Sequence, residues 1–203
     1  MTAVATARTE HVFKLLVTGP FAAGKTSLIQ AISQTPIVET DVDTTGSEAA
    51  IKVRTTVAMD FGTYAIDDGD IRLLMFGTPG QRRFWFMTDI MKGDVDAVIF
   101  VVDAEAEHTH ADAGAEMRSL LRDIRVPVVV AVNRCDDREG AKRLARRLGA
   151  LASEASVPCQ LIRSPSAREV TTEALLSVLD RMEREHASVH DPLDRVLALA
   201  AAG

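Results

Sequence analysis

The sequence predicts an α/β protein built on one mainly parallel β-sheet with helices on both faces. Short apolar runs rich in β-branched residues alternate along the chain with segments of helical periodicity. A glycine-rich turn separates the first such run from the first helical segment. The length of 203 residues suits one domain with a single core.

The first half of the chain is expected to hold three strands and one helix. The first strand spans 12–17 and leads through the glycine-rich turn into a helix over 24–33. Residues 34–55 are polar and lack periodicity, so we expect a long loop, a kind of segment that usually serves function. Strands at 56–66 and 70–76, joined by a tight turn, predict a β-hairpin.

The second half alternates strands with helices. The expected strands are 96–102, 126–132 and 157–162, and the expected helices are 110–123, 138–154 and 168–186. We divide the chain into a loose tail at 1–10, a folded domain at 11–186 and a C-terminal tail or short helix at 187–203. In that last segment Asp191 is a suitable N-cap and Pro192 suits the first helical position.

Composition excludes several classes of function. The net charge of -6 predicts no basic surface for nucleic acid or an anionic membrane. No apolar run is long enough to span a bilayer, Thr2 rules out myristoylation, and the final residues carry no prenylation cysteine, so we expect no direct membrane anchor. Two cysteines, Cys135 and Cys159, suit a reducing compartment. We expect a cytoplasmic monomer.

The turn after the first strand has the spacing of a phosphate-binding loop. Its sequence, GPFAAGKTS, matches the pattern G-x-x-x-x-G-K-[S/T], in which backbone N–H groups turn inward to hold phosphates at a helix N-terminus. Lys25 is predicted to reach the β- and γ-phosphates, and the Thr26 hydroxyl to bind Mg²⁺. The candidate phosphate-binding residues are Gly19, Phe21, Ala22, Ala23, Gly24, Lys25, Thr26 and Ser27.

A second motif, NRCDD, follows the strand at 126–132 and predicts guanine recognition. A carboxylate at Asp136 can accept both the N1–H and the exocyclic amine of guanine. Adenine offers neither group there, so an unpaired carboxylate would reject it. We expect Asn133 to tie this loop to the phosphate loop and Arg134 to lie along the base, where lysine is the usual residue.

In this order, the motifs resemble those of the Ras-like small GTPases, and the resemblance covers residues 11–186. It implies a P-loop G domain with a six-stranded, mostly parallel sheet, one antiparallel edge strand and about five flanking helices. It also implies that GTP and GDP are the ligands and that Mg²⁺ is the metal.

The resemblance also assigns the two switch segments. Thr56, or less suitably Thr55, matches the threonine whose hydroxyl binds Mg²⁺ and whose N–H touches the γ-phosphate. Gly80 matches the glycine whose N–H meets the γ-phosphate, and Gln81 the glutamine that orients the attacking water. Thr26 and Thr56 are therefore expected metal ligands.

The phrases TTVAMDFG and FGTPGQRRFWFM, together with Phe21, are similar to those of the bacterial conservon-type GTPases of actinobacteria, relatives of the MglA polarity GTPases. Members of that group act with Roadblock-type proteins, so the resemblance implies such a partner. No residue of the chain shows this partner by itself.

Gly77 departs from the wider family, which has an aspartate that holds Mg²⁺ through its hydration shell. The glycine removes one negative charge from the metal site. Asp60, in the neighbouring strand of the hairpin, can supply this charge, or it is an ordinary polar strand residue. MglA-like proteins also lack the aspartate, so its absence does not imply an inactive enzyme.

Other residues bear on the rate of turnover. Either Arg82 or Arg83 acts as an arginine finger in cis when the segment repacks, or both are solvated on a surface turn. Phe21 stands where a small residue normally leaves room beside the γ-phosphate, and Pro79 stiffens the next turn. We expect hydrolysis no faster than the intrinsic Ras-like level of roughly 3–5 × 10⁻⁴ per second.

A third base-contacting loop is expected in the segment RSPSARE, in one of two registers. The first register, Ser164 to Ser166, follows from strand length but places Pro165, which has no N–H, at the centre. The second, starting at Ser166, lets Ala167 donate to the base. Ser166 and Ala167 are the candidates that we carry forward.

The expected function is a GTP-binding switch with slow hydrolysis to GDP and phosphate. Three alternatives remain open: a non-hydrolysing guanine-nucleotide scaffold for a Roadblock-type partner, a P-loop ATPase or kinase, and a structural protein with a vestigial loop. The missing carboxylate at Gly77 favours the scaffold, whereas Gln81 argues against it.

Overall fold

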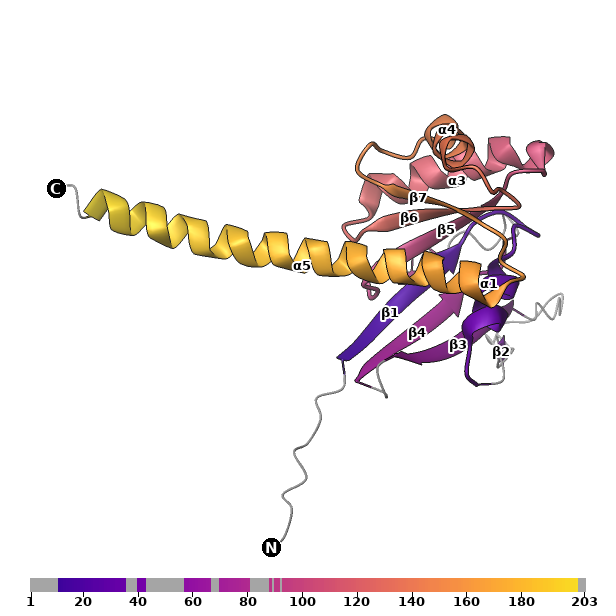
Figure 1. Ribbon diagram of the computed structural model, residues 1–203, viewed down its shortest axis with the longest axis horizontal. Coiled ribbons are helices and arrows are strands. Elements are labelled where there is room, and N and C mark those ends of the chain that lie inside the picture. Colours follow the sequence, from indigo (N-terminus) through magenta and orange to yellow (C-terminus); the bar gives the residue numbers. More distant parts are fainter. Residues whose placement is uncertain are drawn as a thin grey trace, which may run out of the picture.

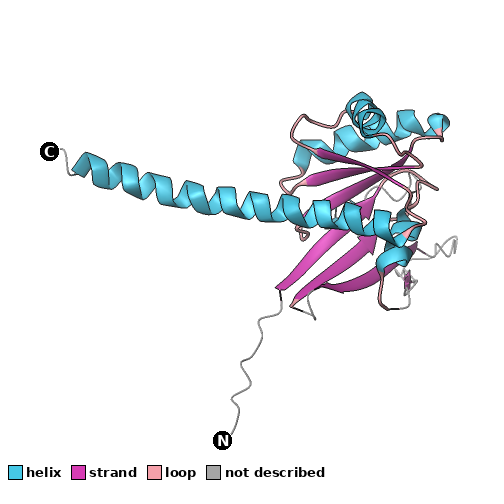
Figure 2. Ribbon diagram, viewed as in Figure 1, coloured by secondary structure: helices cyan, strands magenta, loops and turns pink. Residues whose placement is uncertain are grey.

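The computed structural model describes residues 11–35, 40–42, 57–66, 70–80, 88, 90–91 and 93–200, with side chains for all of these except 40–42, 57–58 and 187–200. A central β-sheet lies between two layers of helices (Figures 1 and 2). The strands are β1 His11–Thr18, β2 Thr40–Val42, β3 Val57–Ile66, β4 Ile71–Gly77, β5 Ala97–Asp103, β6 Val128–Asn133 and β7 Ala155–Cys159. The helices are α1 Lys25–Ile32, the 3-10 helix η3 Glu107–Thr109, α3 His110–Asp123, α4 Arg138–Leu148 and α5 Ser164–Ala200.

The strand order is β2-β3-β4-β1-β5-β6-β7, and only β3 runs antiparallel to its neighbours. The carboxyl ends of β1, β4, β5 and β6 therefore meet at one edge of the sheet, at Thr18, Gly77, Asp103 and Asn133. Ligands of open parallel sheets bind at this edge. The topology thus brings the predicted phosphate and base motifs together.

Two apolar cores lie on opposite faces of the sheet, because side chains alternate along each strand. Leu15 and Val17 belong to the core beneath α1 and α5, whereas Leu16 belongs to the core beneath α3 and α4. In the same way, Phe100 packs on the α3 side and Val101 on the α5 side. Strands buried on both faces explain the continuous apolar runs of the sequence.

The predicted fold class is confirmed, with differences of detail. Six of the seven strands were predicted. The seventh, the three-residue β2, interrupts the predicted loop at 34–55 and takes the edge position next to β3. The described residues contain four α-helices rather than about five. The turn of the hairpin at 67–69 lies outside the described residues.

Three predicted boundaries are wrong. Helix α4 ends at Leu148 rather than at 154, because Gly149 adopts the left-handed conformation with φ 106° and closes the helix. Strand β7 begins at Ala155 and ends at Cys159, before the predicted strand end at 162. Helix α5 continues to Ala200 instead of breaking near residue 187, and Figure 1 shows it extending well beyond the sheet. Alanine and leucine, which favour helix, are frequent in this extension.

None of the helices in the described part of the chain combines the length and the apolar character that a bilayer crossing requires.

The start of α4 offers a test of how this fold is stabilised. The Asp137 side chain caps the helix by accepting from the backbone N–H groups of Glu139 and Gly140. We expect Asp137→Ala to lower the free energy of unfolding by about 1 kcal/mol, measured by urea denaturation. Asp137→Asn keeps the capping oxygen, so its free energy of unfolding should stay close to that of the wild type. Equal losses in both variants would instead assign the effect to the charge of Asp137.

Candidate functional site

The loop between β1 and α1 is curled tightly against the sheet edge. At Gly19, where φ is 130°, an added Cβ would lie 2.1 Å from the Val101 carbonyl oxygen. At Gly24, where φ is 110°, it would lie 2.5 Å from Nδ2 of Asn133. Ala22 also has a positive φ, of 60°. These constraints explain both glycines of the motif and the inward turn of the backbone.

Lys25 lies within this loop, and its side chain is buried with 7% exposure. Its Nζ donates to the carbonyl oxygens of Gly19, at 2.8 Å, and of Pro20, at 2.6 Å. Burial lowers the pKa of Lys25 to about 8, although the charges of Glu116 and Asp60 act in the opposite direction. The loop therefore holds a positive charge that a bound anion would stabilise.

A pocket of about 360 Å³ opens over this lysine, within the usual size range of ligand pockets. Its walls include the predicted residues Phe21, Ala22, Gly24, Lys25, Thr26, Ser27, Asp60 and Gly80. Ala23 is buried behind it, with 2% exposure. An added Cβ on Gly80 would lie 2.5 Å both from Nζ of Lys25 and from the Phe21 backbone nitrogen, so only glycine fits here.

The Asp60 carboxylate contacts the hydroxyl of Thr26, which the sequence predicts to bind a metal ion. The Thr26 hydroxyl donates to Oδ2 of Asp60 at 2.5 Å. Asp60 is paired with Gly77 across the β3–β4 ladder, and an added Cβ on Gly77 would lie 3.0 Å from Cβ of Asp60. The Asp60 side chain thus occupies the space next to Gly77. A carboxylate and a hydroxyl are hard oxygen donors that fit Mg²⁺, which keeps several waters and binds phosphate oxygens.

The described residues contain no cluster of three or more His, Cys, Asp or Glu that could hold a metal by itself. A magnesium ion here would therefore depend on Thr26, Asp60, water and the phosphates of a ligand.

Asn133, at the end of β6, ties the second motif to the phosphate loop as predicted. Its Nδ2 donates to the Ala23 carbonyl at 3.0 Å, and its Oδ1 accepts from the N–H groups of Arg134, at 3.0 Å, and Leu161, at 3.1 Å. All its polar atoms are used, so this buried amide fixes the spacing of three loops.

Asp136 is exposed, and Nε2 of Gln160 donates to its Oδ1 at 3.1 Å. Gln160 was not among the predicted site residues. Its only signal in the sequence is its place directly after β7, the strand that pairs with β6. The turn at 160–163 therefore faces Asp136.

The second register of the third loop is wrong. Ala167 is fully buried inside α5, and its N–H donates to the Arg163 carbonyl at 3.1 Å, so it has no donor for a base. Ser166 lies in the first turn of the same helix. The error arose because β7 ends three residues earlier than predicted.

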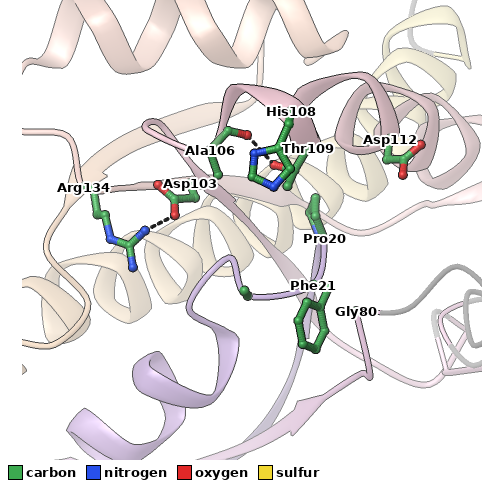
Figure 3. Close-up of a pocket in the computed structure, with 10 residues that line it drawn as sticks. Pro20, Phe21, Gly80, Asp103, Ala106, His108, Thr109, Asp112 and Arg134 are labelled. Atoms are coloured by element: carbon green, nitrogen blue, oxygen red, sulfur yellow. Dashed lines mark hydrogen bonds and ion pairs between the residues drawn. The ribbon is translucent and has the colours of Figure 1, made fainter.

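Arg134 is already paired. Its guanidinium donates to the carboxylate of Asp103 at the end of β5, and Asp103 is only 3% exposed. The pair borders a second pocket of about 550 Å³, which Figure 3 shows between Arg134, the phosphate loop and the start of α3. Phe21 stands at this pocket with 66% of its surface exposed. That Arg134 lies along a base remains a prediction.

Four predicted site residues, Thr56, Gln81, Arg82 and Arg83, lie outside the described residues.

A curled glycine loop at the carboxyl end of the central strand, with a buried lysine inside it, defines a P-loop nucleotide-binding domain. Residues 17–191 match the family described as "conserved hypothetical ATP binding protein", and the chain belongs to this family.

Its relatives include Ras-related proteins. The human Ras-related protein Rab-7L1 is 30% identical over 133 residues, which are 63% of this chain and 61% of that protein. The Ras-related protein Rab-13 of Rattus norvegicus is 29% identical over 146 residues, which are 68% of this chain and 67% of that protein. The uncharacterized protein MJ1339 of Methanocaldococcus jannaschii is 30% identical over 123 residues, 61% of this chain and 70% of that protein. The chain is thus similar to Ras-related proteins over the larger part of its length, and it spans only about three fifths of Rab-7L1.

The lowered pKa of Lys25 predicts a pH dependence of anion binding. Phosphates attract the protonated amine, so affinity should be constant below pH 7 and should fall as the pH rises past about 8, by up to about tenfold per unit. Equilibrium titration with labelled GDP between pH 6.5 and the onset of guanine ionisation measures this. The weaker residual binding of Lys25→Met should not vary with pH in that window. A flat wild-type profile would contradict the prediction.

Proposed function

We propose that the protein is a guanine-nucleotide switch that binds GTP and GDP with Mg²⁺ and hydrolyses GTP slowly. The observation that carries this proposal is the base-side arrangement at the sheet edge. Asp136 is held by Gln160, and the loop that carries Asp136 is joined through Asn133 to the phosphate loop.

The family description names ATP, whereas the base loop of this chain favours guanine over adenine. A carboxylate at Asp136 accepts the two donors that guanine presents and finds no donor on adenine. The Gln160 bond engages Oδ1 of Asp136 and orients the carboxylate. The similarity to Ras-related proteins supports the same choice.

For the metal, we propose that Asp60 replaces the acidic residue that Gly77 lacks. The hydrogen bond from Thr26 to Asp60 supports this proposal, because it brings the two oxygens close enough for one ion to bind both. Mg²⁺, when bound, would neutralise charge on the β- and γ-phosphates. Thr56 would add a third protein oxygen in the GTP-bound state.

In the proposed reaction, each residue of the chain has a separate task. Lys25 binds the phosphate oxygens, and the Gly80 N–H binds the γ-phosphate. Gln81 orients the water that attacks the γ-phosphate. Arg82 or Arg83 would supply positive charge only when a partner repacks the segment, which is why the unassisted rate is low.

The exposed Phe21 supports slow turnover. Its ring stands at the mouth of the pocket, where an arginine from another protein would have to pass. We further propose a cytoplasmic protein of the conservon type, related to MglA, with a Roadblock-type partner. This part of the proposal rests on the motif resemblance.

Single-turnover phosphate release tests the function. On nucleotide-free protein with Mg²⁺, we expect release from GTP at or below roughly 3–5 × 10⁻⁴ per second and none from ATP. Gln81→Leu should slow release with GTP still bound, whereas Lys25→Ala should fail to bind GTP. Comparable release from ATP would reject guanine selectivity. Intact, tightly bound GTP would instead support the alternative, a non-hydrolysing scaffold.

If Asp60 supplies the negative charge of the metal site, an aspartate at position 77 should be able to supply it instead. Asp60→Asn should raise the Mg²⁺ concentration needed to retain GDP by about 10- to 100-fold, because a metal-orienting carboxylate is lost. The double variant Asp60→Gly with Gly77→Asp should recover part of this loss, since it removes the Asp60 contacts of the new Cβ and leaves only the end of the Ile29 side chain to shift.

The measurement is the rate of GDP release at graded Mg²⁺ concentrations. Tyr64→Phe, on the same strand, serves as the control and should leave the Mg²⁺ requirement unchanged. An Asp60→Asn protein with a wild-type Mg²⁺ requirement would remove Asp60 from the metal site.

A further inference from the structure

A buried polar cluster lies directly beneath the phosphate loop, on the α3 side of the sheet. It contains three threonine hydroxyls and one carboxylate, and each member is almost fully buried. They are Thr18, Thr78, Thr88 and Glu116, with exposures of 0%, 4%, 6% and 5%. The neighbouring side chains on this face are apolar, among them Leu16 and Met117. The proposed reaction uses none of the four.

The hydrogen bonds of this cluster have a fixed direction. The Thr18 hydroxyl donates to Oε1 of Glu116 at 3.0 Å, and the Thr78 hydroxyl donates to Oγ1 of Thr18 at 2.9 Å. A hydroxyl has one proton and two lone pairs. Because the Thr18 proton points to Glu116, the Thr88 hydroxyl, 3.1 Å from Oγ1 of Thr18, must also donate. Glu116 therefore sets the orientation of all three bonds.

The Glu116 carboxylate is incompletely satisfied in its buried place. Its Oε2 has no hydrogen-bond partner in the described part of the chain. Burial and the charge of Asp112 raise the pKa of Glu116, while the Thr18 hydroxyl, the charge of Lys25 and the nearby backbone N–H of Gly19 lower it. A buried oxygen without a partner costs free energy, and an apolar side chain of similar length would avoid that cost.

The positions of the threonines indicate a role in the site. Thr18 directly precedes Gly19, the first residue of the phosphate loop. Thr78 stands two residues before Gly80, which lies against Nζ of Lys25. Thr88 lies beyond Gly80 in the chain, so the cluster ties described residues on both sides of Gly80 to the end of β1.

We propose that Glu116 is a positioning residue: by accepting the hydrogen bond from Thr18, it holds Thr78 and Thr88, on either side of Gly80, against the phosphate loop. The Gly80 N–H then keeps its place for the γ-phosphate, and α3 becomes part of the device that separates GTP from GDP. This inference rests on the proposed function.

The test compares release rates of labelled GDP and of a labelled non-hydrolysable GTP analogue, both with Mg²⁺. Glu116→Met removes the acceptor. We expect it to speed release of the GTP analogue by about 3- to 10-fold relative to GDP, because only the analogue has a γ-phosphate for Gly80. Its melting temperature should fall as well, because the Thr18 hydroxyl loses its acceptor and Lys25 loses a nearby negative charge, so the ratio of the two rates is the quantity that tests the inference. Glu116→Gln keeps an acceptor for Thr18 and should preserve the wild-type ratio of the two rates.

Two further variants separate positioning from packing. Met117→Leu changes the neighbouring core residue on the same helix and should leave the ratio of the two rates unchanged. Thr78→Val acts through the same Thr18 hydroxyl, so its effect and that of Glu116→Met should not add in the double variant.

Unchanged release rates in Glu116→Met, or an equal change for both nucleotides, would overturn the inference alone. Additive effects in the double variant would do the same. A wild-type protein that retains neither GDP nor the GTP analogue would overturn the proposed function and this inference with it.

Discussion

The site depends on one constraint: the lysine charge must be held inside a tightly curled loop. Two backbone carbonyls hold the Lys25 ammonium, and this requires the chain to curl between β5 and the base loop. Gly19 and Gly24 permit the curl because any side chain there would strike Val101 or Asn133. The charge remains expensive, as the lowered pKa of Lys25 shows. An anion is the natural compensation, so the fold itself prepares phosphate binding.

The second feature of general interest is the exchange between Gly77 and Asp60. The two residues face each other in the β3–β4 ladder, so the space that one side chain leaves is available to the other. A carboxylate serves a metal site through the position of its oxygen atoms, whichever strand carries the residue. The proposed metal site therefore keeps its charge while its sequence motif is broken, and the absence of a motif residue is weak evidence against activity.

The site is also connected internally to an unusual degree. Asn133 joins three loops, and the cluster around Glu116 joins the end of β1 to α3, Thr78 and Thr88. Both connections are buried, so each bond is strong and each lost partner is costly. Such connections allow a change at the phosphates to reach helices that touch no ligand. In the proposed switch, the loss of the γ-phosphate would alter these helices and thereby control which partner the protein binds.

The sequence by itself determined the fold class, the phosphate loop and the link from Asn133, because glycine spacing and apolar runs report local backbone needs. It could not determine that β7 ends at Cys159, and Ala167 was therefore misassigned as a donor, whereas Gln160 was missed. The hairpin places Asp60 and Gly77 on neighbouring strands, but only the tertiary structure decided the register that puts them opposite each other and the contact between Thr18 and Glu116, which lie 98 residues apart in the chain. Strand register and helix packing set those distances, and neither leaves a periodic signal in the sequence.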